Sequence, residues 1–444
     1  MTEYPSIPYV PSVPFDMGHD RYIRFGPFFE VFEFTDWIDE SMSWKETCYI
    51  GDWSPLMKFS VKGPQALEFW SSITINSFSA FDIGQAKHAV LPNSDGKVMG
   101  EGILMRLAED ELFFTSGPGA VWAAFKFHSG EWDAEYTDLT GAGTIQQVQG
   151  PTSLAVMEEA CGEELRDIEF MRFRKASIEG MEFYLLRQGM SGDIGYEIHG
   201  KMSEGAKVYS RILEVGQKHG IRELGGRTKM VNHVEACYPT PGVDYAPAWG
   251  GIPEEADFRS FIEEAGVVRF NFDRVFNHSG SHEGGFAELY FSPYEMGWGR
   301  SVKFDHEFVG KEALEAEAEN PGRVMRTLVW NAEDVGEVLM SFFKTDGEPY
   351  KFMEWPREYL GHVCADKILD ADGNLAGLAT SRCCSYYFRE MLSLAVIDVD
   401  QAEPGTEVSV VWGDVGKRQK EIRATVAPAP YKTDRRRADL AGAA

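Results

Sequence analysis

Basic residues are scarce in this chain of 444 residues: 43 Lys and Arg stand against 70 Asp and Glu, which gives a formal net charge of -27. Proteins bind nucleic acids and anionic membrane surfaces through basic patches, so we expect neither partner. The basic run at residues 435–437 lies close to the end of the chain, and we expect residues 432–444 to form a solvated tail. The expected partners are small molecules held in pockets.

Cysteines and long apolar runs are also scarce. The six cysteines are scattered without Cys-x-x-Cys spacing, which argues against a disulfide-rich secreted protein and favours a reducing compartment. No stretch approaches the ~20 apolar residues of a membrane span, and the acidic, proline-rich start does not resemble a signal peptide. No His, Cys and Glu cluster has metal-ligand spacing. We therefore expect a cytoplasmic protein without a metal.

Hydrophobic residues make up 43% and aromatic residues 13% of the chain, enough for two or three domains with buried cores. Residues 57–70 and 146–157 repeat one pattern, a strand followed by Gly-Pro and an amphipathic helix. Proline suits the first helical turn because its missing N–H would have no partner there. Between the repeats, residues 87–106 predict a β-hairpin turning at 93–96, and residues 111–116 predict another strand. The pattern indicates a mixed α+β fold.

The second half of the chain begins with a helical pattern at residues 206–218. The stretch 238–292 is rich in glycine, proline and aromatic residues and is too long for a plain connection, so we expect it to line a site or a domain junction. From about residue 322 the pattern changes to short strands, predicted at residues 324–331, 374–383, 391–399, 406–413 and 422–428. These strands predict a small C-terminal β-barrel.

Residues 186–200 read Leu-Arg-Gln-Gly-Met-Ser-Gly-Asp-Ile-Gly-Tyr-Glu-Ile-His-Gly, a glycine-rich turn followed by an apolar strand that carries Glu197. Side chains alternate across a strand, so Glu197 lies on the face opposite Tyr196 and Ile198. Buried carboxylates are rare unless they meet a donor, and a carboxylate accepts two adjacent N–H groups as a forked pair. We predict that Glu197 binds a donor-rich heterocycle; an exposed strand carboxylate is the alternative.

Several short blocks occur in an order that resembles the glycine-cleavage T-protein family, from about residue 37 to residue 431. The blocks are Val-Lys-Gly-Pro at 61–64, residues 93–104, Val-Gln-Gly-Pro at 148–151, the glycine-rich segment, Pro-Tyr-Glu-Met-Gly-Trp-Gly at 293–299, and residues 302–310. The resemblance implies a three-domain cloverleaf with tetrahydrofolate in a central channel, its pterin held by Glu197. The implied domains are a folate-binding domain of residues 1–50 and 140–300 with the insertion 238–292, an α+β domain of residues 51–139, and a C-terminal barrel domain of residues 301–444 with a flexible tail.

Within the family, the insertion and the 293–299 block look most like the tetrahydrofolate-dependent aromatic O-demethylases of the vanillate and syringate type. A related enzyme type opens the methylenedioxy bridge of lignans such as sesamin. The chain lacks the Gly-x-Gly-x-x-Gly of the flavin-fused branch and the Lys-Gly-Cys-Tyr motif of the iron–sulfur assembly branch. We therefore expect an enzyme that takes a methyl or methylene group from a small aromatic ether. An aminomethyltransferase working with a lipoyl carrier protein and a non-catalytic folate-binding protein are the alternatives.

Two residues are predicted to move protons. The resemblance puts Tyr245 near the ether, where it is our candidate for the acid that protonates the leaving phenolate; a matched proton donor contributes roughly 10²–10⁴-fold to the rate. Packing within a proline-rich loop is the alternative for Tyr245. His88, on the strand before the predicted hairpin, is a candidate proton shuttle, and a structural strand histidine is the alternative.

Four further residues are predicted to contact the folate. Gln147 and Gln149 alternate with Val148, so their amides share one face of a strand, although solvation at a sheet edge is equally compatible. Asn232 falls in a segment where relatives have a helix near the cofactor, and an ordinary helix face is its alternative. Glu101 matches the position where the family tends to carry an aspartate close to the reacting nitrogen.

Two departures from the demethylase pattern concern the substrate. The vanillate enzymes carry histidines after the strand at Asp52 and an arginine near Ser116 that can hold a benzoate carboxylate, whereas this chain has Pro-Leu at 55–56 and Thr-Ser-Gly at 115–117. Without an arginine for bidentate pairing, we expect a bulkier, neutral aromatic substrate. Aromatic side chains of the insertion are candidates to stack on it, with core packing as the alternative: Trp249, Phe258, Phe261, Phe270 and Phe272.

Overall fold

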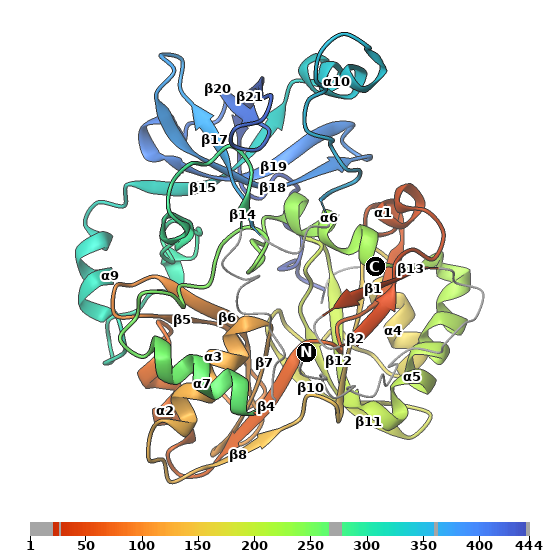
Figure 1. The fold of residues 1–444 in the computed structure, drawn as a ribbon. Helices are drawn as coiled ribbons and strands as arrows, with labels where there is room; N and C mark the ends of the chain where they lie inside the picture. The colour runs from red at the N-terminus through yellow and green to blue at the C-terminus, as the bar shows by residue number, and fades with distance from the viewer. Residues whose placement is uncertain (1–20, 26–27, 266–277, 359–362, 441–444) are drawn as a thin grey trace.

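The structure is a computed structural model that describes residues 21–25, 28–265, 278–358 and 363–440. Its larger β-structures are a five-stranded sheet, a six-stranded sheet and a closed six-stranded barrel. In Figure 1 the barrel lies above the two sheets, which stand side by side beneath it. Across these ranges, no helix combines the length and the apolar character that crossing a membrane requires.

The five-stranded sheet is antiparallel and is built from one stretch of chain between Met57 and Asp138. Its strands in sheet order are β5 (Ala86–Pro92), β6 (Val98–Arg106), β7 (Glu111–Ser116), β4 (Met57–Lys62) and β8 (Glu135–Asp138), and the same stretch carries helices α2 (Ala66–Ile73) and α3 (Pro118–His128). Strands β5 and β6 are the predicted hairpin. Asn93 fixes its turn because its side-chain oxygen accepts the backbone N–H groups of Asp95 and Lys97.

The six-stranded sheet brings distant parts of the chain together. Its strands in sheet order are β10 (Phe173–Ile178), β11 (Met181–Arg187), β12 (Gly195–Lys201), β9 (Gly143–Gln149), β3 (Cys48–Asp52) and β13 (Ile221–Leu224), and its helices are α1 (Trp37–Glu46), α4 (Ser153–Cys161), α5 (Met202–Gly216) and α6 (Gly226–Ala236). Only the β13–β3 pair is parallel. The pairing of β12 with β9 sets Glu197 opposite Gln147.

A steric requirement explains the glycine of each Gly-Pro repeat. Gly63 and Gly150 follow β4 and β9 with φ angles of 149° and 129°, a region that L side chains rarely adopt. A Cβ on Gly150 would lie 2.4 Å from the carbonyl oxygen of Thr47, and one on Gly63 would lie 2.6 Å from that of Asp133. Both prolines precede their helices, which begin at Ala66 and Ser153, instead of standing in the first helical turn as predicted.

The insertion 238–292 packs against both the five-stranded sheet and the barrel. It contains helix α7 (Glu255–Ala265), strand β14 (His278–Ser279) and the 3-10 helix η2 (Phe286–Leu289). Asp244 joins its first loop to the barrel, because one carboxylate oxygen accepts the N–H of Thr240 at 2.8 Å and the other accepts the Thr380 hydroxyl at 2.7 Å and the N–H of Ser381 at 3.0 Å.

The aromatic side chains of the insertion belong mostly to the core. Trp249 and Phe258 are fully buried and pack with Phe261 against Trp122 and Phe125 of α3. They therefore stabilise the attachment of α7, and core packing, the alternative to stacking on a substrate, holds for Trp249 and Phe258. Phe270 and Phe272 lie outside the described residues.

The C-terminal strands close into the predicted barrel. In barrel order they are β15 (Arg323–Trp330), β19 (Glu390–Asp398), β18 (Leu375–Ser385), β17 (Asp366–Leu369), β20 (Glu407–Trp412) and β21 (Lys420–Ala427). This region also contains helices α9 (Lys311–Ala318) and α10 (Ala332–Met340) and the short strand β16 (Val363–Cys364), which pairs with β14. Near the start of the chain, β1 (Tyr22–Phe25) pairs with β2 (Phe28–Val31). The barrel confirms the predicted strands, whereas the division of the chain into three domains at the expected boundaries stays a prediction.

The end of the chain is docked at Lys432 and Leu440, which corrects the expectation of a solvated tail there, while residues 433–435, 437 and 439 are exposed as expected. Lys432 is buried, and Leu440, 2% exposed, joins the core cluster of the six-stranded sheet. The guanidinium of buried Arg187 donates to the backbone carbonyl of Arg436 at 3.2 Å. The charge run suggested solvent, but its backbone and Lys432 find partners in distant segments that the local pattern does not reveal. Residues 441–444 lie outside the described ranges.

Candidate functional site

Glu197 lies in the middle of the six-stranded sheet on β12 and is only 4% exposed. Its neighbours Tyr196 and Ile198 belong to the core cluster on the opposite face. The burial confirms that this carboxylate is not an exposed strand residue. A buried carboxylate needs donors, and the side chains around Glu197 supply them.

A directional hydrogen-bond relay ends on Glu197. The backbone N–H groups of Met190 and Ser191 donate to Oε1 of Gln149 at 2.8 and 2.9 Å, Nε2 of Gln149 donates to Oε1 of Gln147 at 2.7 Å, and Nε2 of Gln147 donates to Oε1 of Glu197 at 2.7 Å. Because the relay begins on N–H donors and ends on a carboxylate, both amides have one possible orientation. The predicted shared face of the two glutamines is confirmed, and it holds Glu197 in one rotamer.

The glycines of the 186–200 segment make room for this relay. A Cβ on Gly195 would lie 2.5 Å from Cγ of Gln149, and a Cβ on Gly189 would lie 3.0 Å from its Oε1. Gly192 has a φ angle of 73°, which favours glycine at the turn. The glycine-rich sequence is therefore a consequence of packing the turn tightly around the Gln149 amide.

Two donors to Glu197 were not among the predicted site residues. Nε2 of Gln188 lies 3.3 Å from Oε1, and Nε2 of His199 lies 3.2 Å from Oε2. When Nε2 of His199 carries the proton, its Nδ1 is an acceptor, and this buried Nδ1 has no hydrogen-bond partner among the described residues. Strand alternation was the available signal for His199, because it follows Glu197 by two residues and must share its face.

Asn232 on α6 contacts Tyr49 of β3, and the Tyr49 hydroxyl lies close enough to Glu197 to be affected by its charge. Its Nδ2 donates to the hydroxyl of Tyr49 at 3.3 Å, while its buried Oδ1 has no partner within the described ranges. Burial raises the pKa of Tyr49 well above 10, and the nearby charge of Glu197 raises it further. Tyr49 therefore stays protonated. Asn232 Oδ1 is an unpartnered acceptor suited to a ligand rich in N–H groups, and His199 Nδ1 is a second one in the tautomer that carries its proton on Nε2.

A second group of predicted residues meets on the five-stranded sheet. Nε2 of His88 on β5 lies 2.8 Å from Oε2 of Glu101 on β6, and both side chains are partly exposed. The ring of Trp298 packs edge-on to His88 with centroids 5.0 Å apart and edge-on to Tyr245 with centroids 6.1 Å apart. Trp298 therefore connects His88 with Tyr245, although the sequence singled it out only as part of a family block.

Tyr245 is fully buried, and its hydroxyl has no hydrogen-bond partner among the described residues. Burial raises its pKa well above 10, and the charges of Glu101 and Asp244 add to the shift. The hydroxyl consequently keeps its proton at neutral pH. Tyr245 and Tyr49 both belong to one large buried cluster, so each group of predicted residues has a member in that cluster.

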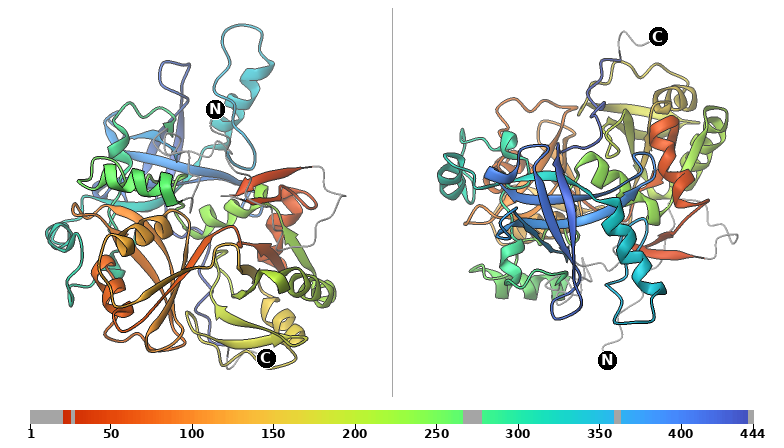
Figure 2. Two further views of the ribbon diagram at one scale, coloured as in Figure 1. Left: turned by 60° about the horizontal axis from the view of Figure 1, so that its bottom comes forward. Right: turned by 90° about the horizontal axis from the view of Figure 1, so that it is seen from above.

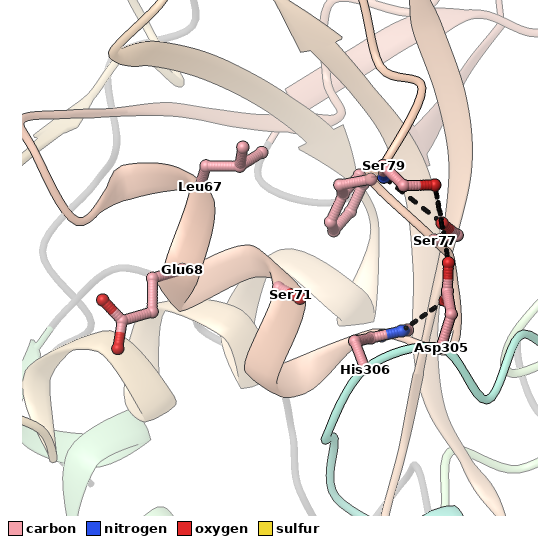
Figure 3. Close-up of a pocket in the computed structure, with 8 residues that line it drawn as sticks. Leu67, Glu68, Ser71, Ser77, Ser79, Asp305 and His306 are labelled. Atoms are coloured by element: carbon pink, nitrogen blue, oxygen red, sulfur yellow. Dashed lines mark hydrogen bonds and ion pairs between the residues drawn. The ribbon is translucent and has the colours of Figure 1, made fainter.

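The family block at 302–310 is connected to the segment after α2 by side-chain hydrogen bonds. Nε2 of His306 lies 2.9 Å from the carbonyl oxygen of Thr74. A carboxylate oxygen of Asp305 accepts the Ser77 hydroxyl at 2.6 Å, and Nδ1 of His306 lies 3.1 Å from Asp305 (Figure 3). These residues line an open cleft beside Leu67 on α2. Over the part of the chain that the structure describes, no group of three His, Cys, Asp or Glu side chains is arranged to hold a metal ion.

Comparison with known proteins finds one family match and several similar proteins. Residues 17–262 match the sequence family described as the GCVT N-terminal domain. The chain is 37% identical to a sesamin methylene transferase from Sinomonas sp. over 91% of this chain and 90% of the relative. It is 33% identical to a syringate O-demethylase from Sphingobium sp. over 90% and 89% of the two chains.

The fold comparison agrees with these relatives. The glycine cleavage system aminomethyltransferase T from Bartonella henselae superposes with a TM-score of 0.69 at 18% identity, over 94% of this chain and 95% of that one. This superposition confirms the predicted α+β fold of the T-protein type, with its C-terminal barrel. With the family match spanning more than half of the residues, the chain belongs to the GCVT family of glycine-cleavage T-protein relatives.

Proposed function

We propose that this protein is a tetrahydrofolate-dependent one-carbon transferase that removes a methyl or methylene group from an aromatic ether. The observation that carries the proposal is the buried Glu197 carboxylate, held in one rotamer by amides whose orientation is fixed. The two relatives with the highest identities quoted above are named for sesamin methylene transfer and syringate O-demethylation. A one-carbon transfer from an aromatic ether is the chemistry common to those names.

The acceptors around Glu197 fit a reduced pterin. Its carboxylate would accept the amino group and the ring N–H of the pterin as a forked pair, while Asn232 Oδ1 and His199 Nδ1 offer further unpartnered acceptors. Gln147 and Gln149 contribute by holding Glu197 and by their remaining amide N–H groups. When bound, tetrahydrofolate supplies the N5 nitrogen that accepts the one-carbon unit. Glu101, on β6 of the five-stranded sheet, is the remaining residue predicted to contact the folate.

Tyr245 is the proposed acid for the departing phenolate. Its hydroxyl is protonated at neutral pH and has no protein partner in the described ranges, so it is available to donate to the ether oxygen. The His88–Glu101 pair, with 2.8 Å between Nε2 and Oε2, is partly exposed and can exchange protons with solvent. Trp298 packs between His88 and Tyr245 and keeps both rings in place.

The proposed substrate is a neutral aromatic. Ser116 lies near the place where the vanillate enzymes carry an arginine, and its hydroxyl donates to the backbone carbonyl of Glu101. That position therefore supports β6 and offers no cation to a benzoate. Methylenedioxy-aromatics and neutral methoxy-aromatics are the favoured substrate classes.

The test of this function is an anaerobic incubation with tetrahydrofolate and a panel of methoxy- and methylenedioxy-aromatics, each in neutral and carboxylated form. Mass spectrometry identifies the folate product. We expect 5-methyl-tetrahydrofolate with a phenol, or methylene-tetrahydrofolate with a catechol, and faster turnover of the neutral compounds. Folate binding without product from any ether, or product only from an aminomethylated carrier protein, would refute the aromatic-ether function.

Replacing Glu197 by glutamine should weaken folate binding. The variant retains the size of the side chain but loses the negative charge and one of the two acceptor oxygens. Hydrogen bonds to charged groups contribute about 1.5–3 kcal/mol, so the Kd for tetrahydrofolate should rise ~10–100-fold. Anaerobic calorimetry measures it. Glu182→Gln, at an exposed position on β11 of the same sheet, is the matched control, and equal affinities for both variants would rule out Glu197 as the pterin ligand.

Replacing Tyr245 by phenylalanine should reduce turnover and leave folate affinity unchanged. The ring still fills its place in the core, but the proton donor is lost, and we expect kcat to fall roughly 10²–10⁴-fold. Single-turnover kinetics at saturating folate measure the chemical step. Tyr184→Phe on β11 controls for the loss of a hydroxyl elsewhere on the protein. A Tyr245→Phe variant with the wild-type rate would remove Tyr245 as the acid.

A further inference from the structure

We propose that Lys432, in the C-terminal segment of residues 432–440, is a positioning residue for Glu197, the side-chain carboxylate proposed to bind the folate. The inference rests on the proposed function, because it concerns the same site. It assigns a role to a part of the chain that lies far beyond residues 17–262, the range that matches the family domain. Lys432 acts through the glycine-rich turn and does not itself touch Glu197.

The ammonium group of Lys432 is buried where three segments meet. Its Nζ donates to the carbonyl oxygen of Ser191 at 3.0 Å, to a carboxylate oxygen of Asp193 at 3.3 Å and to the carbonyl oxygen of Trp44 at 3.4 Å. The backbone N–H of Lys432 donates to the carbonyl of Glu235 on α6 at 2.8 Å. An ammonium group has three donors, so these acceptors satisfy it completely and fix its position.

Ser191 connects this ammonium group to the relay. Its carbonyl accepts from Lys432, and its N–H donates to Oε1 of Gln149 at 2.9 Å. From Gln149 the hydrogen bonds continue through Gln147 to Glu197, with 2.7 Å at each step. One uninterrupted series of contacts therefore runs from the C-terminal segment to the predicted pterin ligand.

The turn at residues 188–193 depends on such external contacts. Gly189 and Gly192 give its backbone conformational freedom, so its own sequence does not fix its shape. Tyr238 holds one end by donating its hydroxyl to the carbonyl of Gly189 at 3.0 Å. The C-terminal segment holds the other end through Lys432 and through the N–H of Arg435, which donates to the carbonyl of Gly192 at 2.9 Å. Loss of the Lys432 contacts should let the Ser191 N–H move away from Gln149.

The buried Asp193 carboxylate requires a second variant. Asp193 is 2% exposed and pairs with Lys432 at 3.3 Å and with the more exposed Arg435 at 3.8 Å. Lys432→Met alone therefore leaves a buried charge with only the longer of its two ion pairs, which can destabilise the fold. The double variant Lys432→Met/Asp193→Asn removes both charges and retains the hydrogen-bonding shape of residue 193. Lys432→Arg keeps a cation at this place and serves as the conservative rescue. Arg437→Met, at an exposed position of the same segment, is the matched control.

The experiment measures anaerobic tetrahydrofolate binding, kcat and thermal unfolding for the full-length wild type and these variants. We expect Lys432→Met and the double variant to raise the Kd for tetrahydrofolate about tenfold, which is a loss of ~1.4 kcal/mol of binding free energy. The kcat at saturating folate should change less than about twofold. Lys432→Arg should recover most of the affinity, and Arg437→Met should match the wild type.

The possible results distinguish a failure of the positioning role of Lys432 from a failure of the proposed function. Wild-type affinity in a folded Lys432→Met variant, or in the double variant where the single one does not fold, would overturn the positioning role and leave the proposed function standing. A fall in kcat equal to the loss of affinity would also overturn it, since a general structural defect would explain both. A wild-type protein that binds no tetrahydrofolate would instead overturn the proposed function, and the positioning role with it.

Discussion

The burial of one carboxylate is the constraint around which this site is organised. Removing an ionised carboxylate from water costs several kcal/mol unless donors replace the solvent, and Glu197 is 4% exposed. The sheet register provides Gln147 directly across from it, and the same face provides His199. The glycine-rich turn follows from this arrangement, because only a turn without side chains at Gly189 and Gly195 packs closely enough to orient Gln149.

The two halves of the proposed chemistry come from different parts of the fold. Acceptors for the pterin lie on the six-stranded sheet, whereas the groups that move protons lie on the five-stranded sheet and the insertion. Asp244 fixes the loop that carries Tyr245 by bonding to barrel strand β18. The barrel, which lies above the two sheets in Figure 1 and is seen from above in the right view of Figure 2, thus holds the loop of the proposed acid.

Local sequence patterns predicted what depends on local periodicity. Strand alternation was enough to anticipate the buried face of Glu197 and the shared face of the two glutamines, and the barrel strands followed from their short apolar runs. The contacts of Trp298 and Lys432 were not predictable in this way, because each depends on segments more than fifty residues away. Composition was misleading at one place, because the charged tail is docked through the buried side chain of Lys432.

The measurement that tests the central claim most directly is a crystal structure of the protein with tetrahydrofolate bound. The account predicts that the pterin amino group and ring N–H lie on the Glu197 carboxylate, that the Gln149–Gln147 relay is retained, and that the reacting nitrogen faces the Tyr245 hydroxyl. A pterin bound elsewhere, with Glu197 still satisfied only by Gln147, Gln188 and His199, would contradict it.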